Sequence, residues 1–494
     1  MRGRRVLVAL GLLVALALAG LVVLKETVLG EEALKGMLLG RIEASTALKA
    51  EAQGLRVFLL KGIVLEGLRL KGPGGQRFME LQRLKLRYSL LALLRGQVLI
   101  TRAELVRPRL WLLRDRQGRL NLPRAKGAPP AEQRGGPPLA LLIKDIALKD
   151  ASVYFSDQTG AVPALRVRFD GRAELGLARE GLRYLARLRL KDIEAQLPQG
   201  LRGSGEVQIE PSRATFLIDL EVGANALSLK GVLKDYLGRN PRLQAHLRAE
   251  RLDLQSLALP RAGKDKRAAK RAAPGPAEAG LTASGTVQLR EAFLKNTLRL
   301  KDIEAHYRYQ KGLLYIKLQM GFSTLGLLHG EGDLRGSLVL NPLKPAETLS
   351  GTLRLRARGG RLRESSFSQA LVVLTGLEAL RAPVLESTEA SLELQDGRGR
   401  LEASLKGRHF SLGLEGSVEL LGALDLKGTL RLSPTLSTGL SQALPLSRLL
   451  QDEAGHTLLA LLIRGTPRSP SVRLDAERLG RKGIWEFFKG IFGR

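Results

Sequence analysis

The sequence contains no cysteine among its 494 residues. This absence excludes disulfide bonds, thiolate zinc sites and a cysteine nucleophile, and it leaves the redox compartment undecided. Histidine is also rare. The five histidines, His246, His306, His329, His409 and His456, show no spacing typical of metal ligands. We therefore expect no metal and no other cofactor.

Aromatic residues make up only 4% of the chain, whereas lysine and arginine outnumber the acidic residues and give a net charge of +31. Such a charge is typical of a protein that binds nucleic acid or an anionic membrane surface, or of a basic protein with no polyanionic partner. Nucleic-acid-binding proteins tend to cluster their charge and to interleave it with stacking aromatic residues. Here the cations are spread along the whole chain. We therefore expect no nucleic acid as a partner, and an exported polyanion-binding protein is the weaker hypothesis.

Motifs of several enzyme classes are missing. The sequence has no GxxxxGK[ST] phosphate loop, no HExxH, no GxSxG and no EF-hand pattern. The carboxylates are scattered through a strongly basic chain and suggest no glycosidase pair. Glycine-rich Gly330–Gly336 departs from the GxGxxG spacing and predicts a turn. We expect no catalytic residues and no enzymatic activity.

The most apolar run lies at the N-terminus. Three arginines within the first five residues precede 19 uncharged residues, Val6 to Leu24, and about 20 apolar residues cross a bilayer as a helix. The positive-inside rule places the N-terminus in the cytoplasm and the remainder outside. A cleaved signal peptide is the alternative, because Ala17–Ala19 could form a processing site. The apolar run continues past that site, so residues 1–24 are predicted to be a single-pass anchor.

Two helices are expected outside this segment. The first lies within Glu31–Ala52, with Leu34, Met37, Leu38 and Ile42 on its apolar side. The second follows a serine start signal within residues 365–382. Both are expected to be short amphipathic helices.

The rest of the chain is predicted to form β-structure. From Val57 onward, short stretches such as Gly62–Leu70 and Gly351–Ala357 alternate apolar and polar residues, as strands with one apolar face do. The predicted fold is mainly β (α+β): a long, curled, mostly antiparallel sheet that forms an open apolar groove, with an N-terminal transmembrane helix and a few short amphipathic helices. A closed barrel or sandwich is the alternative, because periodicity does not choose between them.

Two segments interrupt the alternation. Residues 124–138 are rich in proline and glycine, and residues 260–280 form a basic proline/alanine-rich segment that is either a solvated loop or a contact with anionic lipid. The predicted organisation is an anchor at 1–24, the first helix and β-groove segment at 25–123, a linker at 124–138, a β-groove segment at 139–259, a linker at 260–280, a β-groove segment at 281–356, a C-terminal region at 357–476 and a basic amphipathic tail helix at 477–494.

The octapeptide LRLKDIEA occurs twice, at Leu188–Ala195 and Leu298–Ala305. In both copies, the apolar residues before and after Lys-Asp are three positions apart in the sequence rather than two. This phase shift predicts a β-bulge or tight turn that keeps them on one face, and aspartate suits such positions because it bonds the local backbone. We interpret Lys-Asp as a structural joint rather than a catalytic pair. The candidate groove residues on this face are Leu188, Leu190, Ile193, Ala195, Val287, Leu289, Leu298, Leu300, Ile303 and Ala305.

The last residues predict a basic amphipathic helix. Its apolar residues fall within about 160° of a helical wheel, a geometry suited to a lipid headgroup boundary. A helix that caps the end of the sheet is the alternative. The candidate membrane-interface residues are Ile484, Trp485, Phe487, Phe488, Ile491 and Phe492.

The order of these segments resembles the AsmA-like family of bacterial envelope proteins. At the N-terminal end the resemblance rests on the anchor, Gly62–Leu70, Tyr88–Pro123 and Ile143–Asp157, and at the C-terminal end on Ala357–Ala382 and Arg464–Asp475. The family is similar to bridge-like lipid carriers, whose curled sheet holds acyl chains in an apolar groove. It offers no catalytic residues to carry over. This chain departs from the family in being rather short and very basic.

The resemblance implies a periplasmic lipid-binding protein anchored in the inner membrane, which carries or conducts phospholipid toward the outer membrane and supports outer-membrane biogenesis. Its expected partners are phospholipid acyl chains, the inner membrane, and outer-membrane or periplasmic proteins. The alternative is a scaffold or assembly factor for outer-membrane proteins that acts through β-strand addition.

Overall fold

A computed structural model of the chain describes residues 31–478 except 47, 59–61, 73, 90–98, 118, 123–140, 160–162, 179–180, 198–199, 237, 239, 256–280, 295–296, 343, 420–422, 444, 467–468 and 476. The predicted anchor, both predicted linkers and all six tail candidates lie outside the described residues. The chain divides into two compact units. Unit 1 comprises Met1–Leu247 and Ser256–Thr282, and unit 2 comprises Arg248–Gln255 and Ala283–Arg494.

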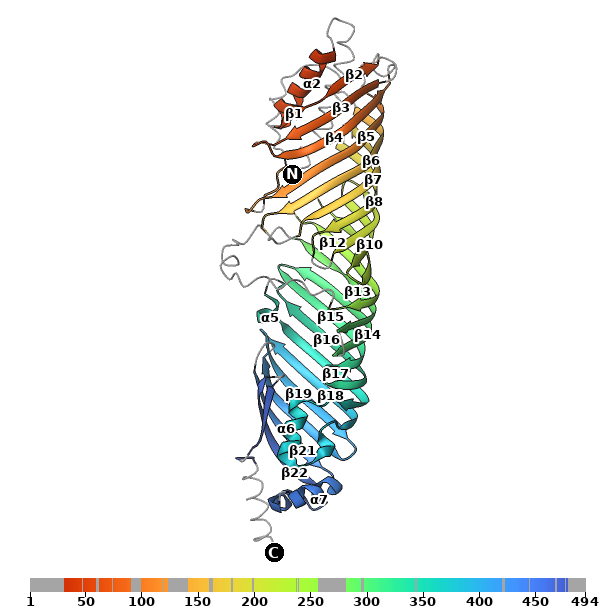
Figure 1. Cartoon of the computed structure of the whole chain (residues 1–494). Helices are drawn as coiled ribbons and strands as arrows, with labels where there is room; N and C mark the ends of the chain where they lie inside the picture. The colour runs from red at the N-terminus through yellow and green to blue at the C-terminus, as the bar shows by residue number, and fades with distance from the viewer. Residues whose placement is uncertain are drawn as a thin grey trace. The chain divides into compact units, whose positions relative to one another are not determined.

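The described part of unit 1 is an open sheet with one helix at its start (Figure 1). Strands β1 and β2 both pair with β3, and each strand from β3 to β11 pairs with the next in the chain. The elements are α2 (Glu31–Thr46), β1 (Lys49–Glu51), β2 (Gly54–Phe58), β3 (Gly62–Lys71), β4 (Arg77–Tyr88), β5 (Leu99–Arg114), β6 (Leu141–Asp157), β7 (Leu165–Ala178), β8 (Gly181–Ala195), β9 (Leu201–Ile209), β10 (Arg213–Val222), β11 (Asn225–Lys234) and the first half of β12 (Arg242–Asp253).

One pair in unit 1 is parallel. Strands β5 and β6 run side by side in the same direction from Leu99 opposite Leu142 to Arg114 opposite Asp157. Parallel neighbours need a connection that returns the chain to the edge where the first strand began. The other strand pairs described here are antiparallel, so the prediction of a mostly antiparallel sheet is confirmed.

Unit 2 continues with an antiparallel meander, in which each strand from β13 to β23 pairs with the next. Among the described residues, no pairing joins β23 back to β13, so the sheet is open rather than closed. The elements are β13 (Thr282–Leu294), β14 (Leu298–Gln310), β15 (Leu313–Leu325), β16 (Leu328–Leu340), α5 (Pro345–Thr348), β17 (Ser350–Leu362), α6 (Ser366–Thr375), η2 (Glu378–Leu380), β18 (Val384–Gln395), β19 (Arg398–Gly407), β20 (Phe410–Glu419), β21 (Leu424–Leu432), α7 (Pro434–Ala443), η3 (Pro445–Leu450), β22 (Thr457–Thr466) and β23 (Ser469–Leu474).

Helix α2 packs on the apolar face of the first strands. Leu34 and Leu38 are fully buried and Ile42 is nearly so, in one cluster with side chains of β2 to β6. The prediction was wrong for Met37, which is 48% exposed. It was also wrong for the end of the helix, which stops at Thr46 rather than Ala52. The chain turns there because strand β1 begins only three residues later and pairs with β3.

Helix α6 confirms the second predicted helix. The Ser365 side chain accepts a hydrogen bond from the Ser368 N–H, and the Ser368 hydroxyl accepts one from the Ser365 N–H, which forms a capping box. The helix ends before Ala382 because Gly376 adopts a left-handed conformation, with φ of 69°. Its buried residues pack with those of α7 and of β20 to β22.

The Lys-Asp joints are β-bulges inside continuous strands. The register shifts between Leu190 and Ile193 in β8, between Lys301 and Glu304 in β14, and after Leu148 in β6. Asp302 has φ of 48°, in the left-handed region that aspartate tolerates better than most residues. The predicted phase shift is therefore confirmed as a bulge, and the apolar residues on either side keep to one face.

The glycine-rich segment Gly330–Gly336 is not the predicted turn but lies within β16. A Cβ atom on Gly332 would lie 2.5 Å from Cζ of Phe322, and one on Gly336 would lie 2.5 Å from Cδ2 of Leu353. Glycine is required here because a large side chain of a neighbouring strand lies over each position. The segment therefore serves packing across strands rather than a change of chain direction.

Candidate functional site

The four candidate groove residues of unit 1 lie on one face of strand β8. Leu188 is opposite Val207 of β9, and Leu190 and Ile193 are opposite Gly205 and Gly203. Residues directly opposite each other in a sheet point to the same face. These side chains therefore share a surface with those of β7 and β9, and Ala195 continues it opposite Leu201.

The six candidates of unit 2 form a similar surface on β13 and β14. Val287 is opposite Ala305, and Leu289 is opposite Ile303. Leu298 and Leu300 pair with apolar partners, Leu294 and Ala292. The structure therefore brings the candidates together in two groups, four in unit 1 and six in unit 2.

One apolar row crosses the whole of unit 2. Register partners connect a single residue from each of eleven successive strands, and every member is apolar or glycine. The row consists of Val287, Ala305, Leu318, Gly336, Leu353, Leu392, Leu401, Gly416, Leu426, Ile463 and Val472.

The neighbouring row points to the opposite face and is polar throughout. It consists of Thr286, His306, Lys317, Ser337, Thr352, Glu393, Arg400, Ser417, Asp425, Arg464 and Ser471. Adjacent residues on a strand alternate between faces, so the two rows separate an apolar face from a polar face across all eleven strands.

The helices that the structure describes cover the apolar face at particular strands. In unit 1, α2 packs over the strands from β2 to the start of β6, and in unit 2, α6 and α7 pack over β20 to β22 (Figure 1). In the described part of unit 2, no helix belongs to the apolar cluster that contains Phe322 and Ala357, in the strands between. The middle of the apolar face is therefore left to side chains of the sheet itself.

The exposure of the candidates divides them into two kinds. Leu190, Ile193, Leu289 and Ile303, which flank the bulges, are each 8% exposed. The other six are half-buried, whereas most neighbours on the polar face are exposed. The four buried residues act chiefly in packing, and the half-buried ones present the surface that a ligand could touch.

The environment of Tyr307 reflects this difference between the faces. Tyr307 lies opposite Ile316 in the register, next to the apolar row. Burial raises the pKa of its hydroxyl above the ordinary value, because the charged phenolate would lose its hydration there. The position of Tyr307 beside the apolar row thus disfavours a charge on its side chain.

On the polar face, side chains beside the bulges form hydrogen bonds and ion pairs. Nζ of Lys191 lies 2.6 Å from a carboxylate oxygen of Asp170, and the Asp150 N–H donates to Asp170 at 2.8 Å. Burial alone would raise the pKa of Asp170, but these two hydrogen bonds, together with the positive charges of Lys191 and Arg189, lower the pKa below its usual value. Arg168 and Asp192 form a further ion pair, 2.8 Å apart.

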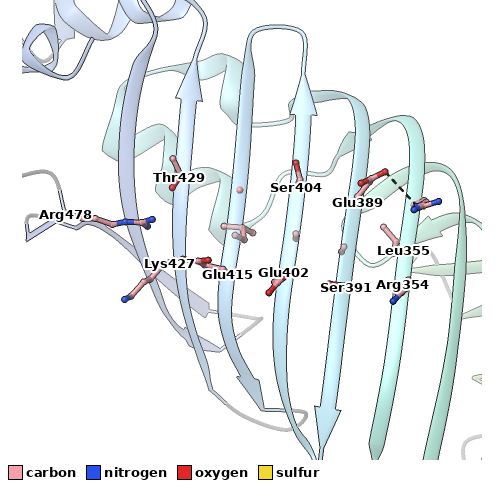
Figure 2. A pocket seen from close by; sticks show the side chains of 15 residues that line it. Arg354, Leu355, Glu389, Ser391, Glu402, Ser404, Glu415, Lys427, Thr429 and Arg478 are labelled. Atoms are coloured by element: carbon pink, nitrogen blue, oxygen red, sulfur yellow. Dashed lines mark ion pairs between the residues drawn. The ribbon is translucent and has the colours of Figure 1, made fainter. Parts of the chain in front are cut away.

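The polar face of unit 2 carries a hollow of about 480 Å³ on strands β17 to β21 (Figure 2). Glu402 and Glu415 are directly opposite each other in its centre, with Lys427 on one side and Ser391 and Arg354 on the other. Two carboxylates thus lie between two cations along one row, and the hollow has no strong excess of either charge.

Two further properties concern the described residues only. No group of three or more histidine, aspartate or glutamate side chains is placed to hold a metal ion there. None of the helices that the structure describes is long and apolar enough to cross a membrane, and the predicted anchor lies outside that part of the chain.

The sequence did not single out most of the row that crosses unit 2. Of its eleven members only Val287 and Ala305 were among the candidates. Leu318, Leu353 and Leu392 lie in strands that the alternation did predict, but only the hydrogen-bond register shows that they stand opposite one another. A prediction of strand pairing would have been the missing signal.

These features define a class of protein: an open, mostly antiparallel β-sheet that has an apolar face in each unit, with helices over some of its strands. Residues 2–160 match the model of the AsmA family. The resemblance inferred from the sequence is thereby confirmed for this part, which is about a third of the chain. Similarity to this family fits a function related to the bacterial envelope and to outer-membrane biogenesis. No curated protein and no solved structure matches the chain.

Proposed function

We propose that this protein binds phospholipid acyl chains along the apolar face of its sheet and carries or conducts them between the membranes of the envelope, without catalysing a reaction. The observation that carries the proposal is the apolar row from Val287 to Val472, which crosses eleven strands with no polar member. A lipid tail is long, flexible and uniformly apolar, and such a row offers it an equivalent contact at each strand.

The hydrophobic effect supplies the reason for an occupant. Burial of apolar surface is worth about 25 cal/mol per Å², and soluble proteins rarely expose apolar patches beyond a few hundred Å². In the described middle of unit 2, neighbouring side chains shelter the row but no helix covers it. An acyl chain on this face would remove both surfaces from water.

The polar face supports the same function from the other side. Its exposed lysine, arginine and glutamate side chains keep that face in water, so the sheet has one wet and one apolar surface along its length. A lipid could then lie with its tails on the apolar face and its headgroup in solvent beyond the strand ends. This arrangement supports movement along the sheet without full burial of the headgroup.

We further propose that residues 1–24 anchor the chain in the inner membrane with its bulk in the periplasm, and that residues 477–494 contact a lipid surface. Both proposals rest on the sequence. An anchor would place the start of unit 1 beside the lipid source, and the basic, aromatic tail suits a headgroup boundary.

Strand addition to a protein partner receives less support. The outermost strand of unit 2, β23, has a free edge in the described residues, but Pro470 lies within it. Proline has no N–H to donate and is typical of strands that resist pairing at their edge. The scaffold hypothesis therefore stays the alternative.

Two adjacent residues on β15 test the lipid proposal. Leu318 belongs to the apolar row, and Gln319 points to the polar face. Leu318→Asp should reduce the phospholipid that copurifies with the full chain, because an unpaired carboxylate against acyl chains costs several kcal/mol. Gln319→Asp adds the same charge to the same strand and should leave the lipid content unchanged. Mass spectrometry of a native extract measures both.

Folding must be checked by circular dichroism and protease resistance before the lipid is compared. Leu318 suits this test better than Ile303, since the latter is only 8% exposed and its replacement would chiefly test stability. Equal phospholipid content in a folded Leu318→Asp protein and the wild type would show that the row is not a lipid path. Bound unfolded outer-membrane protein in place of lipid would favour the scaffold alternative.

A further inference from the structure

Unit 1 carries a larger hollow, of about 860 Å³, over strands β5 to β12. Leu188 and Val207 are among its lining residues, but the charged residues of β8 and β9 in the lining occupy the alternate positions of the same strands. Their side chains therefore point away from the apolar face on which lipid binding is proposed.

Positive charge dominates this hollow. Seven lysine and arginine side chains line it, against two carboxylates, Asp170 and Glu206. Two of the cations are already neutralised, because Lys149 lies 3.1 Å from Glu104 and Arg102 lies 3.5 Å from Asp145. Five cations remain that form no ion pair with a described carboxylate: Arg172, Arg187, Arg189, Arg213 and Lys230.

The two carboxylates in the lining do not balance the positive charge of these five cations. Asp170 is engaged by Nζ of Lys191 at 2.6 Å and by the Asp150 N–H, and the charge of Arg189 also helps to lower its pKa. Glu206 is the other carboxylate in the lining, opposite Arg189 in the register. Two carboxylates, one of them already paired with Lys191, therefore face five cations, which leaves a local excess of positive charge.

Two of the five cations oppose each other directly. Arg172 of β7 and Arg187 of β8 are register partners, and like charges at opposed positions destabilise a sheet. Gln208 and Thr215 continue the row on β9 and β10 and offer neutral hydrogen-bonding groups. Two forked guanidinium groups beside an amide and a hydroxyl form a suitable set of donors for phosphate oxygens.

The hollow of unit 2 shows that this excess is not a general property of the polar face. There, Arg354, Arg356, Lys427 and Arg478 line the hollow with three glutamates (Figure 2). Arg335 and Arg354 are also opposed, yet Glu389 lies 3.9 Å from Arg356 and two more carboxylates stand in the centre. The same strand geometry thus produces a nearly neutral hollow in unit 2 and a strongly basic one in unit 1.

We propose that the hollow of unit 1 is an anion-binding site for a ligand that presents two or more phosphate groups, held chiefly by Arg172 and Arg187. The ligand neutralises the opposed arginines and uses Gln208 and Thr215 as further partners. The phosphates can belong to a soluble compound or to the headgroup of an anionic lipid. This site does not depend on the proposed lipid path, which lies on the other face.

Titration calorimetry with tripolyphosphate tests the site on the full chain in a neutral detergent. Arg172→Gln with Arg187→Gln should weaken binding by about tenfold or more, because two charge-assisted contacts are lost. The matched control is Arg335→Gln with Arg354→Gln, an opposed pair with the same change in net charge, and it should change the dissociation constant by less than about twofold. Thermal unfolding should show no loss of stability, since repulsion is relieved.

Equal weakening in the two double variants would overturn the site in favour of general attraction to a basic chain, and absence of binding by the wild type would overturn it outright. If the double variant fails to fold, Lys230→Gln alone should still weaken binding. Flotation with phosphatidylglycerol vesicles then separates the sources: loss of vesicle binding in the double variant indicates a lipid headgroup, and unchanged vesicle binding with lost tripolyphosphate binding indicates a soluble ligand. Copurifying phospholipid should be the same in all variants.

Discussion

Single glycines on the apolar face decide how the side chains around them lie. A Cβ atom on Gly203 would lie 2.7 Å from Cδ2 of Leu220, and one on Gly231 would lie 2.4 Å from Cζ of Phe216. The same relation holds between Gly332 and Phe322. Each large side chain can thus lie across a neighbouring strand instead of standing away from the sheet, which explains why apolar residues are half-buried where no helix covers them.

Gly332→Ala should therefore destabilise unit 2. The added Cβ would lie 2.4 Å from the Arg356 carbonyl oxygen and 2.5 Å from Phe322, and such overpacking costs about 1–3 kcal/mol. Gly413→Ala is the matched control, because nothing lies within 4 Å of its Cβ position. Urea unfolding of both variants measures the difference, and an equal free energy of unfolding for the two would contradict the packing role.

The Asp170 carboxylate should make stability depend on pH. Its pKa is lowered in the folded state, so its contribution is fully present above the ordinary aspartate pKa, about 3.9. That contribution is lost as pH falls through the folded-state value. Asp170→Asn should reduce the loss of stability between pH 6 and pH 3. Asp302→Asn, at a bulge where the described residues place no cation on the carboxylate, is the control and should follow the wild type.

At the scale of elements, helix α2 shows that two residues placed on the same apolar side by the sequence pattern can differ in burial. Leu38 of α2 is fully buried against the first strands, while its neighbour Met37 is 48% exposed. Leu38→Ala should cost about 2–5 kcal/mol, as for other buried leucines. Met37→Ala should change the free energy of unfolding by less than about 0.5 kcal/mol. Chemical denaturation compares them, and a similar cost at both positions would mean that α2 does not pack as described.

Strands and bulges could be predicted from the sequence because both depend on neighbours along the chain. The three-residue step from Leu190 to Ile193 already indicated the bulge that the register confirms. The two apolar groups of candidates followed from the same alternation. Local pattern was therefore sufficient for element type and for the face on which a residue lies.

Pairing between strands could not be read in this way. The direction of β6 beside β5 depends on how the intervening chain crosses the sheet. The glycines of β16 resembled a turn because their purpose, room for Phe322 and Leu353, lies on other strands. The basic hollow of unit 1 likewise arises only when the register places Arg172 opposite Arg187.

At the scale of the whole molecule, the net charge is +31, but the fraction of cations that are paired with carboxylates differs from one surface to another. The hollow of unit 2 mixes cations with carboxylates, while that of unit 1 leaves five cations without an ion pair to a described carboxylate. Net charge alone therefore does not identify a binding surface. The informative quantity is the number of cations left over after local pairing.

The proposed location of the molecule has a direct test. If residues 1–24 form an uncleaved anchor, N-terminal sequencing of the membrane-bound protein should begin within the first residues of the chain. A mature protein that begins at Gly20 would instead identify a signal peptide. Extraction with carbonate is the control, since an anchored chain stays with the membrane pellet.

The parallel pair in unit 1 has a consequence for how the chain folds. Antiparallel neighbours joined by short turns can be added one at a time, each by closing a small loop. Strand β6 can pair with β5 only when the 26 residues between Arg114 and Leu141 close a loop. Closing such a loop costs about 1.5 kcal/mol more than closing one of about four residues. We therefore expect growth of the sheet to slow at this point, with β5 as a temporary edge strand. Strand β5 contains Pro108 and several charged residues, and such residues disfavour pairing of an exposed edge with another chain. They therefore protect β5 against aggregation until β6 has paired with it.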